Sequence, residues 1–346
     1  MQHIPIFLSS DDKYSAVLSV AMHSICYNTS NFIEFYVLDG GINTFSKKLI
    51  SKITEKFNNC SVEFIEIDVN KYFKDFKTGA RTTVATYFRF LIPDLKPNID
   101  RAIYIDCDVV VLDDIVKLYE EDLGDYIIGA IPEYGYDLIN ILKDIKNNYN
   151  INLEHIYFNA GVLLIDCDKW RRENVTQKLF ELEQKYKSVL IHLDQDILNK
   201  YFDCNYKRLN IKYNAQYFNE DKIELYAEEY KQELRTLKQN IVVRHFIQVK
   251  PWCNYSRILP YYNNVEKYVL CFKEFWFFAK MTYFYESLLN EYICKSVADG
   301  SLYSSKLRTF KIKFCGISLL TIKKSKVYLF NIIPLFRIKY IFDAVD

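Results

Sequence analysis

Short apolar runs alternate with longer mixed segments over the first 250 residues, and this alternation limits the folds open to the chain. The runs HIPIFLSS, IEFYVLDG, VEFIEID, AIYIDCDVVV, YIIGAIPE and NAGVLLID have the composition of β-strands. Helix candidates lie between the early runs, at Tyr14–Tyr27, Ser46–Phe57 and Thr83–Leu91. Alternating strands and helices indicate an α/β domain with a mostly parallel sheet, which binds ligands beyond the carboxyl ends of its strands.

The sequence changes character near Pro251. Residues 255–295 are dense in Tyr and Phe at helical spacing, and two later segments, FKIKFCGISLLTIKK and KVYLFNIIPLFRIKY, resemble each other. We read these two segments as a tandem pair of hairpins. The chain therefore divides, in our interpretation, into an α/β domain over residues 1–255 and a helical and β-hairpin extension over residues 256–346.

The extension is basic although the whole chain has a formal net charge of only +1. Nine Lys and Arg residues follow residue 300, against two Asp residues, and they are mixed with Phe, Tyr, Ile and Leu. This composition fits an anchor on an anionic membrane surface, and it equally fits a subdomain with an ordinary basic surface. The nearly neutral total gives no sign of a nucleic-acid partner.

Several common protein classes do not fit the sequence. The nine cysteines include no Cys-x-x-Cys pair, so a disulfide framework or zinc finger is not expected and a reducing cytoplasm is the simplest location. The N-terminus lacks the pattern of a signal peptide, and the most apolar segment, YVLCFKEFWFFAKMTYFY, contains three charged residues. We therefore expect a cytoplasmic protein, either free or bound at the inner face of the membrane.

The tripeptide Asp-Cys-Asp occurs twice, and the two copies have different surroundings. In YIDCDVVV, strand geometry predicts that Asp106 and Asp108 share one face while Cys107 points the other way. Two carboxylates on one face repel unless a cation such as Mg²⁺ or Mn²⁺ lies between them, or unless both face water at a strand end. In LLIDCDKW, Asp168 stands where a long amphipathic helix begins, so we predict a helix cap there.

Other familiar catalytic motifs are absent from the sequence. It has no glycine-rich phosphate loop, no His-Glu-x-x-His and no Gly-x-Ser-x-Gly. His245 follows a strand-like run and His192 precedes the LDQD segment, and by itself each is an ordinary structural histidine or a ligand.

Six motifs in order carry a resemblance to a known family. FLSSDDKY, TYFRFLIPDL, YIDCDVVVLDDI, YFNAGVLLIDCDKWR, LDQDILN and HF followed by KPW span about residues 4–252. In this respect the chain resembles retaining glycosyltransferases of family 8, which include glycogenin and bacterial lipopolysaccharide galactosyl- and glucosyltransferases. The resemblance implies the GT-A fold, with a Rossmann-like sheet, over residues 1–255.

The resemblance also implies roles for individual positions. It implies a Mn²⁺ or Mg²⁺ site at Asp106, Asp108 and His245, and catalytic roles for Asp194, Gln195 and Lys250. The implied nucleotide-sugar and cofactor contacts are Ser9, Asp11, Tyr14, Thr86, Arg89, Asp106, Cys107, Asp108, Asn159, Ala160, Asp194, Gln195, His245 and Lys250.

The implied reaction is transfer of a hexose, glucose or galactose, from a UDP-sugar to a glycan such as a lipopolysaccharide or lipooligosaccharide core. The metal and Lys250 are expected to balance the charge of departing UDP, and the amide oxygen of Gln195 to face the cationic sugar carbon. Two alternatives remain. One is an inactive family member that binds sugar or a protein partner, and the other is a nucleotidyltransferase that makes nucleotide sugars.

Two departures from the family pattern affect these expectations. The loop HFIQVKPW is one residue shorter than usual and carries Gln248 in place of a glycine, which bears on the role of Lys250. Glu133 stands where many relatives have Asp, and this longer acid could alter the choice of sugar.

Overall fold

The computed structural model describes residues 2–79, 83–134, 157–216, 223–224, 228–237, 239–247, 250–252, 265–298, 309–314, 317–323, 326–329 and 333–337. The chain forms two compact units, which we describe separately. The first comprises residues 1–248 and 273–285, and the second comprises residues 249–272 and 286–346. The predicted boundary after residue 255 lies outside the described residues and stays a prediction.

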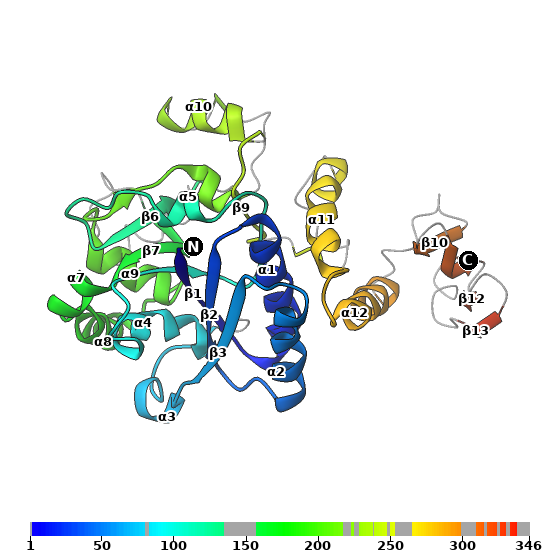
Figure 1. Ribbon diagram of the computed structural model, residues 1–346, viewed down its shortest axis with the longest axis horizontal. Coiled ribbons are helices and arrows are strands. Elements are labelled where there is room, and N and C mark those ends of the chain that lie inside the picture. The colour runs from blue at the N-terminus through cyan, green and yellow to red at the C-terminus, as the bar shows by residue number, and fades with distance from the viewer. Residues whose placement is uncertain are drawn as a thin grey trace. The chain divides into compact units, whose positions relative to one another are not determined.

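A mixed, mostly parallel sheet forms the centre of the first unit (Figure 1). Its seven strands stand in the order β3-β2-β1-β4-β7-β6-β8. β1 pairs in parallel with β2 and β4, whereas β7 runs antiparallel to both β4 and β6. The strands are β1 (His3–Ser10), β2 (Phe32–Asp39), β3 (Cys60–Glu66), β4 (Arg101–Ile105), β6 (Ile128–Pro132), β7 (Phe158–Asp166) and β8 (Lys207–Arg208).

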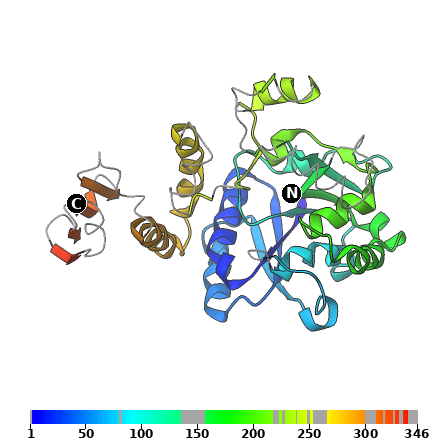
Figure 2. The same ribbon diagram turned by 180° about the vertical axis from the view of Figure 1, so that it is seen from behind.

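Helices flank the sheet on both sides, as Figures 1 and 2 show from opposite directions. The side of Phe7 and Tyr104 forms one large apolar cluster with aromatic residues that include Phe88 and Trp170. The α-helices of this unit are α1 (Ser15–Asn28), α2 (Thr44–Ser51), α3 (Val69–Tyr72), α4 (Ile92–Leu95), α5 (Val116–Tyr119), α7 (Cys167–Arg172), α8 (Val175–Tyr186), α9 (Asp194–Phe202) and α10 (Glu228–Leu237).

Short 3-10 turns add to these helices and modify two of the predicted ones. The segment predicted as a helix over Thr83–Leu91 is a 3-10 helix, and the one over Ser46–Phe57 is divided between α2 and a 3-10 turn. The third prediction, Tyr14–Tyr27, agrees with α1. The 3-10 helices are η1 (Asp12–Tyr14), η2 (Lys52–Glu55), η3 (Val84–Leu91) and η4 (Ile211–Asn214).

The second Asp-Cys-Asp copy has a structural role, but the capping residue lies two positions earlier than predicted. Asp166, not Asp168, caps helix α7, because its side chain accepts a hydrogen bond from the backbone N–H of Lys169. The predicted long helix is also wrong, since it divides into α7 and α8 at Asn174. That residue adopts left-handed backbone angles, which interrupt a right-handed helix.

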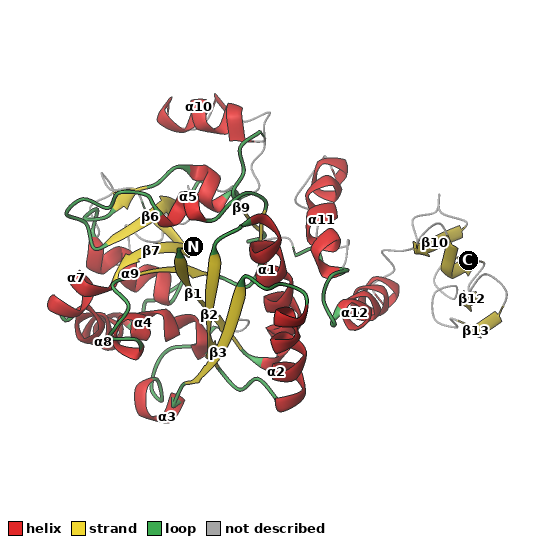
Figure 3. Ribbon diagram, viewed as in Figure 1, coloured by secondary structure: helices red, strands yellow, loops and turns green. Residues whose placement is uncertain are grey.

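A four-stranded antiparallel sheet lies in the second unit, and its secondary structure is drawn in Figure 3. Strands β10 (Thr309–Phe314) and β11 (Ile317–Lys323) pair with each other, as do β12 (Lys326–Leu329) and β13 (Ile333–Arg337). This confirms the predicted tandem hairpins, and the pairing of β11 with β12 joins them. The predicted helical spacing before them corresponds to α11 (Val265–Ala279) and α12 (Tyr285–Ala298).

Candidate active site

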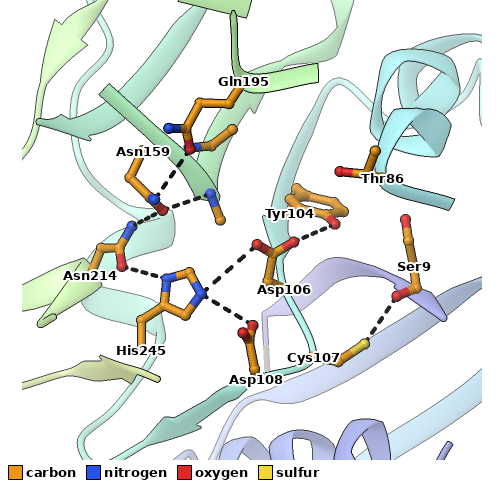
Figure 4. A network of polar contacts seen from close by, with 12 residues as sticks. Ser9, Thr86, Tyr104, Asp106, Cys107, Asp108, Asn159, Gln195, Asn214 and His245 are labelled. Atoms are coloured by element: carbon orange, nitrogen blue, oxygen red, sulfur yellow. Dashed lines mark hydrogen bonds and ion pairs between the residues drawn. The ribbon is translucent and has the colours of Figure 1, made fainter. Parts of the chain in front are cut away.

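The first Asp-Cys-Asp copy lies in a turn between two strands rather than within a strand. β4 ends at Ile105, and β5 (Val109–Val111) begins just after Asp108. Our prediction of a continuous strand was therefore wrong. The predicted separation of the side chains nevertheless holds, because Asp106 and Asp108 turn toward His245 while Cys107 points toward Ser9 (Figure 4).

A small two-stranded sheet brings His245 to these aspartates. β5 pairs antiparallel with β9 (Val243–His245), so that Val109 stands opposite His245. The backbone N–H of Phe246 donates to the carbonyl of Asp108 at 2.9 Å, and the N–H of Asp106 donates to the carbonyl of Gly161 at 2.8 Å. Backbone hydrogen bonds thus fix the segments that carry all three side chains.

The three side chains form a set that suits a divalent cation. Their ligand atoms lie within 4.8 Å of one another. His245 Nε2 is 3.1 Å from Asp108 Oδ1 and 3.9 Å from Asp106 Oδ2. Two carboxylate oxygens and one imidazole nitrogen are ligands that suit Mn²⁺. Soft metals prefer sulfur ligands, so this set suits them less well.

Gly161 keeps open the space around this set. A Cβ at this position would lie 2.3 Å from His245 Cε1 and 2.7 Å from Asp106 Oδ2, closer than non-bonded atoms approach. The close packing of His245 and Asp106 against this strand therefore requires glycine at position 161. The sequence contains this glycine in a strand-like run, where it marks a close approach, but the partner cannot be read from it.

A line of amide side chains connects His245 to the predicted sugar-binding residues. His245 Nδ1 is 2.9 Å from Asn214 Oδ1, and Asn214 Nδ2 donates to Asn159 Oδ1 at 2.8 Å. Asn159 Nδ2 in turn lies 2.9 Å from Glu133 Oε2 and 3.2 Å from Gln195 Oε1. Figure 4 shows this line running from His245 to Gln195. Sequence reasoning missed Asn214, which follows the apolar residues of a 3-10 helix without any motif.

The amide of Gln195 has the opposite orientation to the one we expected. Its Oε1 accepts from the backbone N–H of Ala160 at 2.9 Å and from Asn159 Nδ2. A backbone N–H can only donate, so this oxygen must face strand β7. The oxygen of the Gln195 amide therefore already accepts two hydrogen bonds within the protein. The nitrogen, Nε2, is the end of the amide that points away from Ala160 and Asn159.

Arg89 connects the metal ligands to Asp194. Its guanidinium is buried, donates to Asp106 Oδ1 at 2.9 Å and pairs with Asp194 Oδ2 at 3.0 Å. It also lies over the ring of Tyr104, whose hydroxyl donates to Asp106 Oδ1 at 2.7 Å. Arg89 thus holds two carboxylates of the protein together, and its predicted contact with the nucleotide sugar stays a prediction.

Burial and charge act in opposite directions in this cluster. Burial disfavours the charged form of Arg89, but the carboxylates of Asp106 and Asp194 outweigh it and raise the pKa of Arg89. At Asp194 burial is the larger effect, and it raises the pKa of this carboxyl to about 6 despite Arg89 and a hydrogen bond from Thr86. The cluster thus holds a permanent cation beside an acid that titrates near neutrality.

The predicted nucleoside contacts lie where β1 ends. The carbonyl of Ser9 accepts from Cys107 Sγ at 3.0 Å, which places the end of β1 beside the metal-ligand turn. The Ser9 hydroxyl is buried without a hydrogen-bond partner among the described residues. Asp11 caps the turn η1 through the backbone N–H of Tyr14, whose side chain is 38% exposed. Contacts of these residues with a nucleotide stay a prediction.

The loop HFIQVKPW carries the remaining predicted residues. Lys250 belongs to the second unit, and Gln248 lies outside the described residues, so the role of the shortened loop stays a prediction.

In the part of the chain that the structure describes, no helix combines the length and apolar character needed to cross a bilayer.

Comparison with known proteins gives one consistent family. The profile of Glycosyl transferase family 8 matches residues 5–256. General stress protein A of Bacillus subtilis is 32% identical over 75% of this chain and 91% of its own length. A lipopolysaccharide 1,2-glucosyltransferase of Escherichia coli is 25% identical over 74% of this chain and 75% of its length. The crystal structure of galactosyltransferase LgtC with donor and acceptor sugar analogues is 25% identical, with a TM-score of 0.67 over 81% of this chain and 96% of that one.

Proposed function

Because the chain belongs to glycosyltransferase family 8 and is a hexosyltransferase, we propose that it transfers glucose or galactose from a UDP-sugar with retention of the anomeric configuration. The observation that carries this proposal is the convergence of Asp106, Asp108 and His245 beside the line of amides that ends at Gln195. Two carboxylates and one imidazole next to a set of sugar-binding amides suit a nucleotide diphosphate joined to a hexose.

Asp106, Asp108 and His245 are the residues that would hold Mn²⁺ or Mg²⁺. When bound, such an ion supplies charge stabilisation to the diphosphate leaving group. Arg89 fixes the orientation of Asp106, because its guanidinium and the Tyr104 hydroxyl both donate to the same oxygen, Oδ1. That arrangement leaves Oδ2 of Asp106 as the oxygen that faces His245.

The amide groups are proposed to orient the hexose. Gln195 offers Nε2 donors to a sugar hydroxyl, since its Oε1 is held by Ala160 and Asn159. Glu133, buried and bonded to Asn159, adds an acceptor at the same edge. Asp194 supports this group by pairing with Arg89. Lys250 is proposed to balance charge on the departing UDP.

The acceptor is proposed to be a glycan at a membrane surface, such as a lipopolysaccharide or lipooligosaccharide core. The similarity to a lipopolysaccharide glucosyltransferase supports this class of acceptor. The basic residues after position 300 support contact with anionic lipid, which is the proposed location of the enzyme at the cytoplasmic face.

A donor screen tests the proposal directly. The purified chain is incubated with Mn²⁺ and, in turn, UDP-glucose, UDP-galactose, UDP-N-acetylglucosamine and UDP-N-acetylgalactosamine, and released UDP is measured. We expect release from one of the first two, lost on addition of EDTA and in Asp106→Ala and Asp108→Ala. Near-normal release by either variant contradicts the metal assignment, and no release from any donor supports a sugar-binding protein instead.

A further inference from the structure

We infer that Asn214 is a positioning residue that fixes the tautomer of His245, so that Nε2 is the nitrogen left to bind a cation. The role of Nε2 in binding a cation rests on the proposed function. The position of the proton on His245 follows from hydrogen-bond directions alone. Asn214 is fully buried, at 0% exposure, and contacts both His245 and Asn159 through its side chain.

The direction of every hydrogen bond in the line follows from one backbone group. The N–H of Gly161 lies 2.9 Å from Asn159 Oδ1. Because a backbone N–H can only donate, the Asn159 atom facing it must be the oxygen. The same argument applies to the N–H of Ala160 and Oε1 of Gln195, so the two amides have compatible orientations.

The orientation then passes to Asn214. The Asn214 atom next to Asn159 Oδ1 has to donate, so it is Nδ2, and the distance is 2.8 Å. The other end of the amide, Oδ1, therefore faces His245 Nδ1 at 2.9 Å. An amide oxygen can only accept, so Nδ1 of His245 carries the proton.

The consequence appears at the opposite nitrogen of the ring. In the neutral imidazole, a proton on Nδ1 leaves a lone pair on Nε2, which is 3.1 Å from Asp108 Oδ1. Three electron-rich atoms then face one another, and a cation between them removes the repulsion. Removing a hydrogen-bond partner that orients a ligand histidine typically changes metal affinity about 10–100-fold.

The same line also reaches Gln195 through Asn159. The residue that orients the metal ligand is therefore the residue that completes the hydrogen bonds of the proposed sugar-binding amides. Asn214 thus links the proposed metal-binding end of the site, through His245, to the proposed sugar-binding end, through Asn159. In this inference it contacts neither the cation nor the sugar.

Nitrogen NMR of the histidine side chains tests the inference. The chain has five histidines, and His245→Gln identifies the signal of interest. We expect a proton on Nδ1 in the metal-free protein, and we expect it to remain there when Mg²⁺ is added. Asn214→Ala should give a mixture of tautomers and weaken Mn²⁺ binding about 10–100-fold, measured from the free-Mn²⁺ electron paramagnetic resonance signal.

Two further variants separate positioning from general damage. Asn214→Asp keeps an acceptor toward Nδ1, so it should retain the wild-type tautomer and Mn²⁺ affinity, although it loses the donor to Asn159. Asn199→Ala is the matched control, because Asn199 is a buried asparagine that bonds the backbone of Phe158 and Gln195 and does not touch His245. It should leave the His245 tautomer unchanged.

The outcomes are distinct from those of the donor screen. A wild-type protein in which Nδ1 of His245 carries no proton overturns the inference whether or not any variant folds. A wild-type tautomer and unchanged Mn²⁺ affinity in Asn214→Ala overturn it as well. Failure of UDP release with all four donors rejects the proposed reaction but leaves the tautomer measurement valid.

Discussion

Replacing Gly161 by alanine places a methyl group where the side chains of the predicted metal site meet. The added Cβ would lie 2.3 Å from His245 Cε1, 2.7 Å from Asp106 Oδ2 and 2.9 Å from Asn159 Oδ1. Ordinary carbon–carbon contacts begin near 3.5 Å, so the imidazole ring has to retreat by about 1 Å. The retreat separates Nε2 from the two carboxylates and disturbs the bond to Asn214.

The size of the effect follows from this displacement. Metal sites require ligand distances within about 0.2 Å of their preferred values, so a shift of about 1 Å removes His245 from the ligand set. We expect Mn²⁺ affinity to fall at least about 10-fold and UDP release about 100-fold. The overpacked strand should also cost about 1–3 kcal/mol in the free energy of unfolding.

Gly129→Ala provides the matched control. Its Cβ would lie 2.8 Å from Leu123 Cδ2 and 2.9 Å from Leu209 Cδ1, so it overpacks the neighbouring strand at a distance from the metal ligands. Urea unfolding should show a similar loss of stability in both variants, whereas Mn²⁺ titration should show a loss of affinity only in Gly161→Ala. Wild-type Mn²⁺ affinity in Gly161→Ala would refute the reasoning.

Three other perturbations test separate parts of the account. Arg89→Met should lower the free energy of unfolding by about 3 kcal/mol in urea titration, because it removes the cation that pairs with the buried carboxylate of Asp194 and the partly buried carboxylate of Asp106; a loss below 1 kcal/mol contradicts that role. Burial raises the pKa of Asp194 from 3.8 to about 6, so its contribution to stability is complete below pH 3.8 and is lost as pH rises through 6. Relative to Asp194→Asn, the wild type should gain about 1 kcal/mol between pH 7.5 and pH 5, and a gain in the opposite direction counts against it. The full chain should sediment with vesicles that contain anionic lipid and be released by high salt or by removal of residues 300–346, whereas binding that survives both changes excludes the tail as the anchor.

The sequence was sufficient to predict the alternation of strands and helices and the meeting of Asp106, Asp108 and His245. Strands and helices could be predicted because their apolar patterns depend only on residues close together in the sequence. The three site residues, Asp106, Asp108 and His245, could be predicted because they lie in the six motifs. Local patterns were less informative at element ends. The run AIYIDCDVVV was predicted as one strand, but β4 stops at Ile105 and β5 begins at Val109. The cap of α7 is Asp166, whose side chain accepts from the N–H of Lys169.

Asn214 and Gly161 could not be predicted for a different reason. The roles of both residues depend on neighbours that are distant in sequence, since Asn214 bonds residues 31 and 55 positions away. A buried asparagine and an exposed one look alike in a sequence, because burial is decided by tertiary packing. The orientation of the Gln195 amide was missed likewise, as it is set by a backbone N–H on β7.

The pairing of β5 with β9 determines when the three residues of the proposed metal site can come together during synthesis and folding. Asp108 and His245 are 137 residues apart, and the strand that presents the histidine is one of the last parts of the domain to leave the ribosome. Contacts of such long sequence separation form late, after loop closure has been compensated by local structure. A cation held by Asp106, Asp108 and His245 would therefore need β5 and β9 already paired, so the proposed site would be a product of folding rather than a template for it.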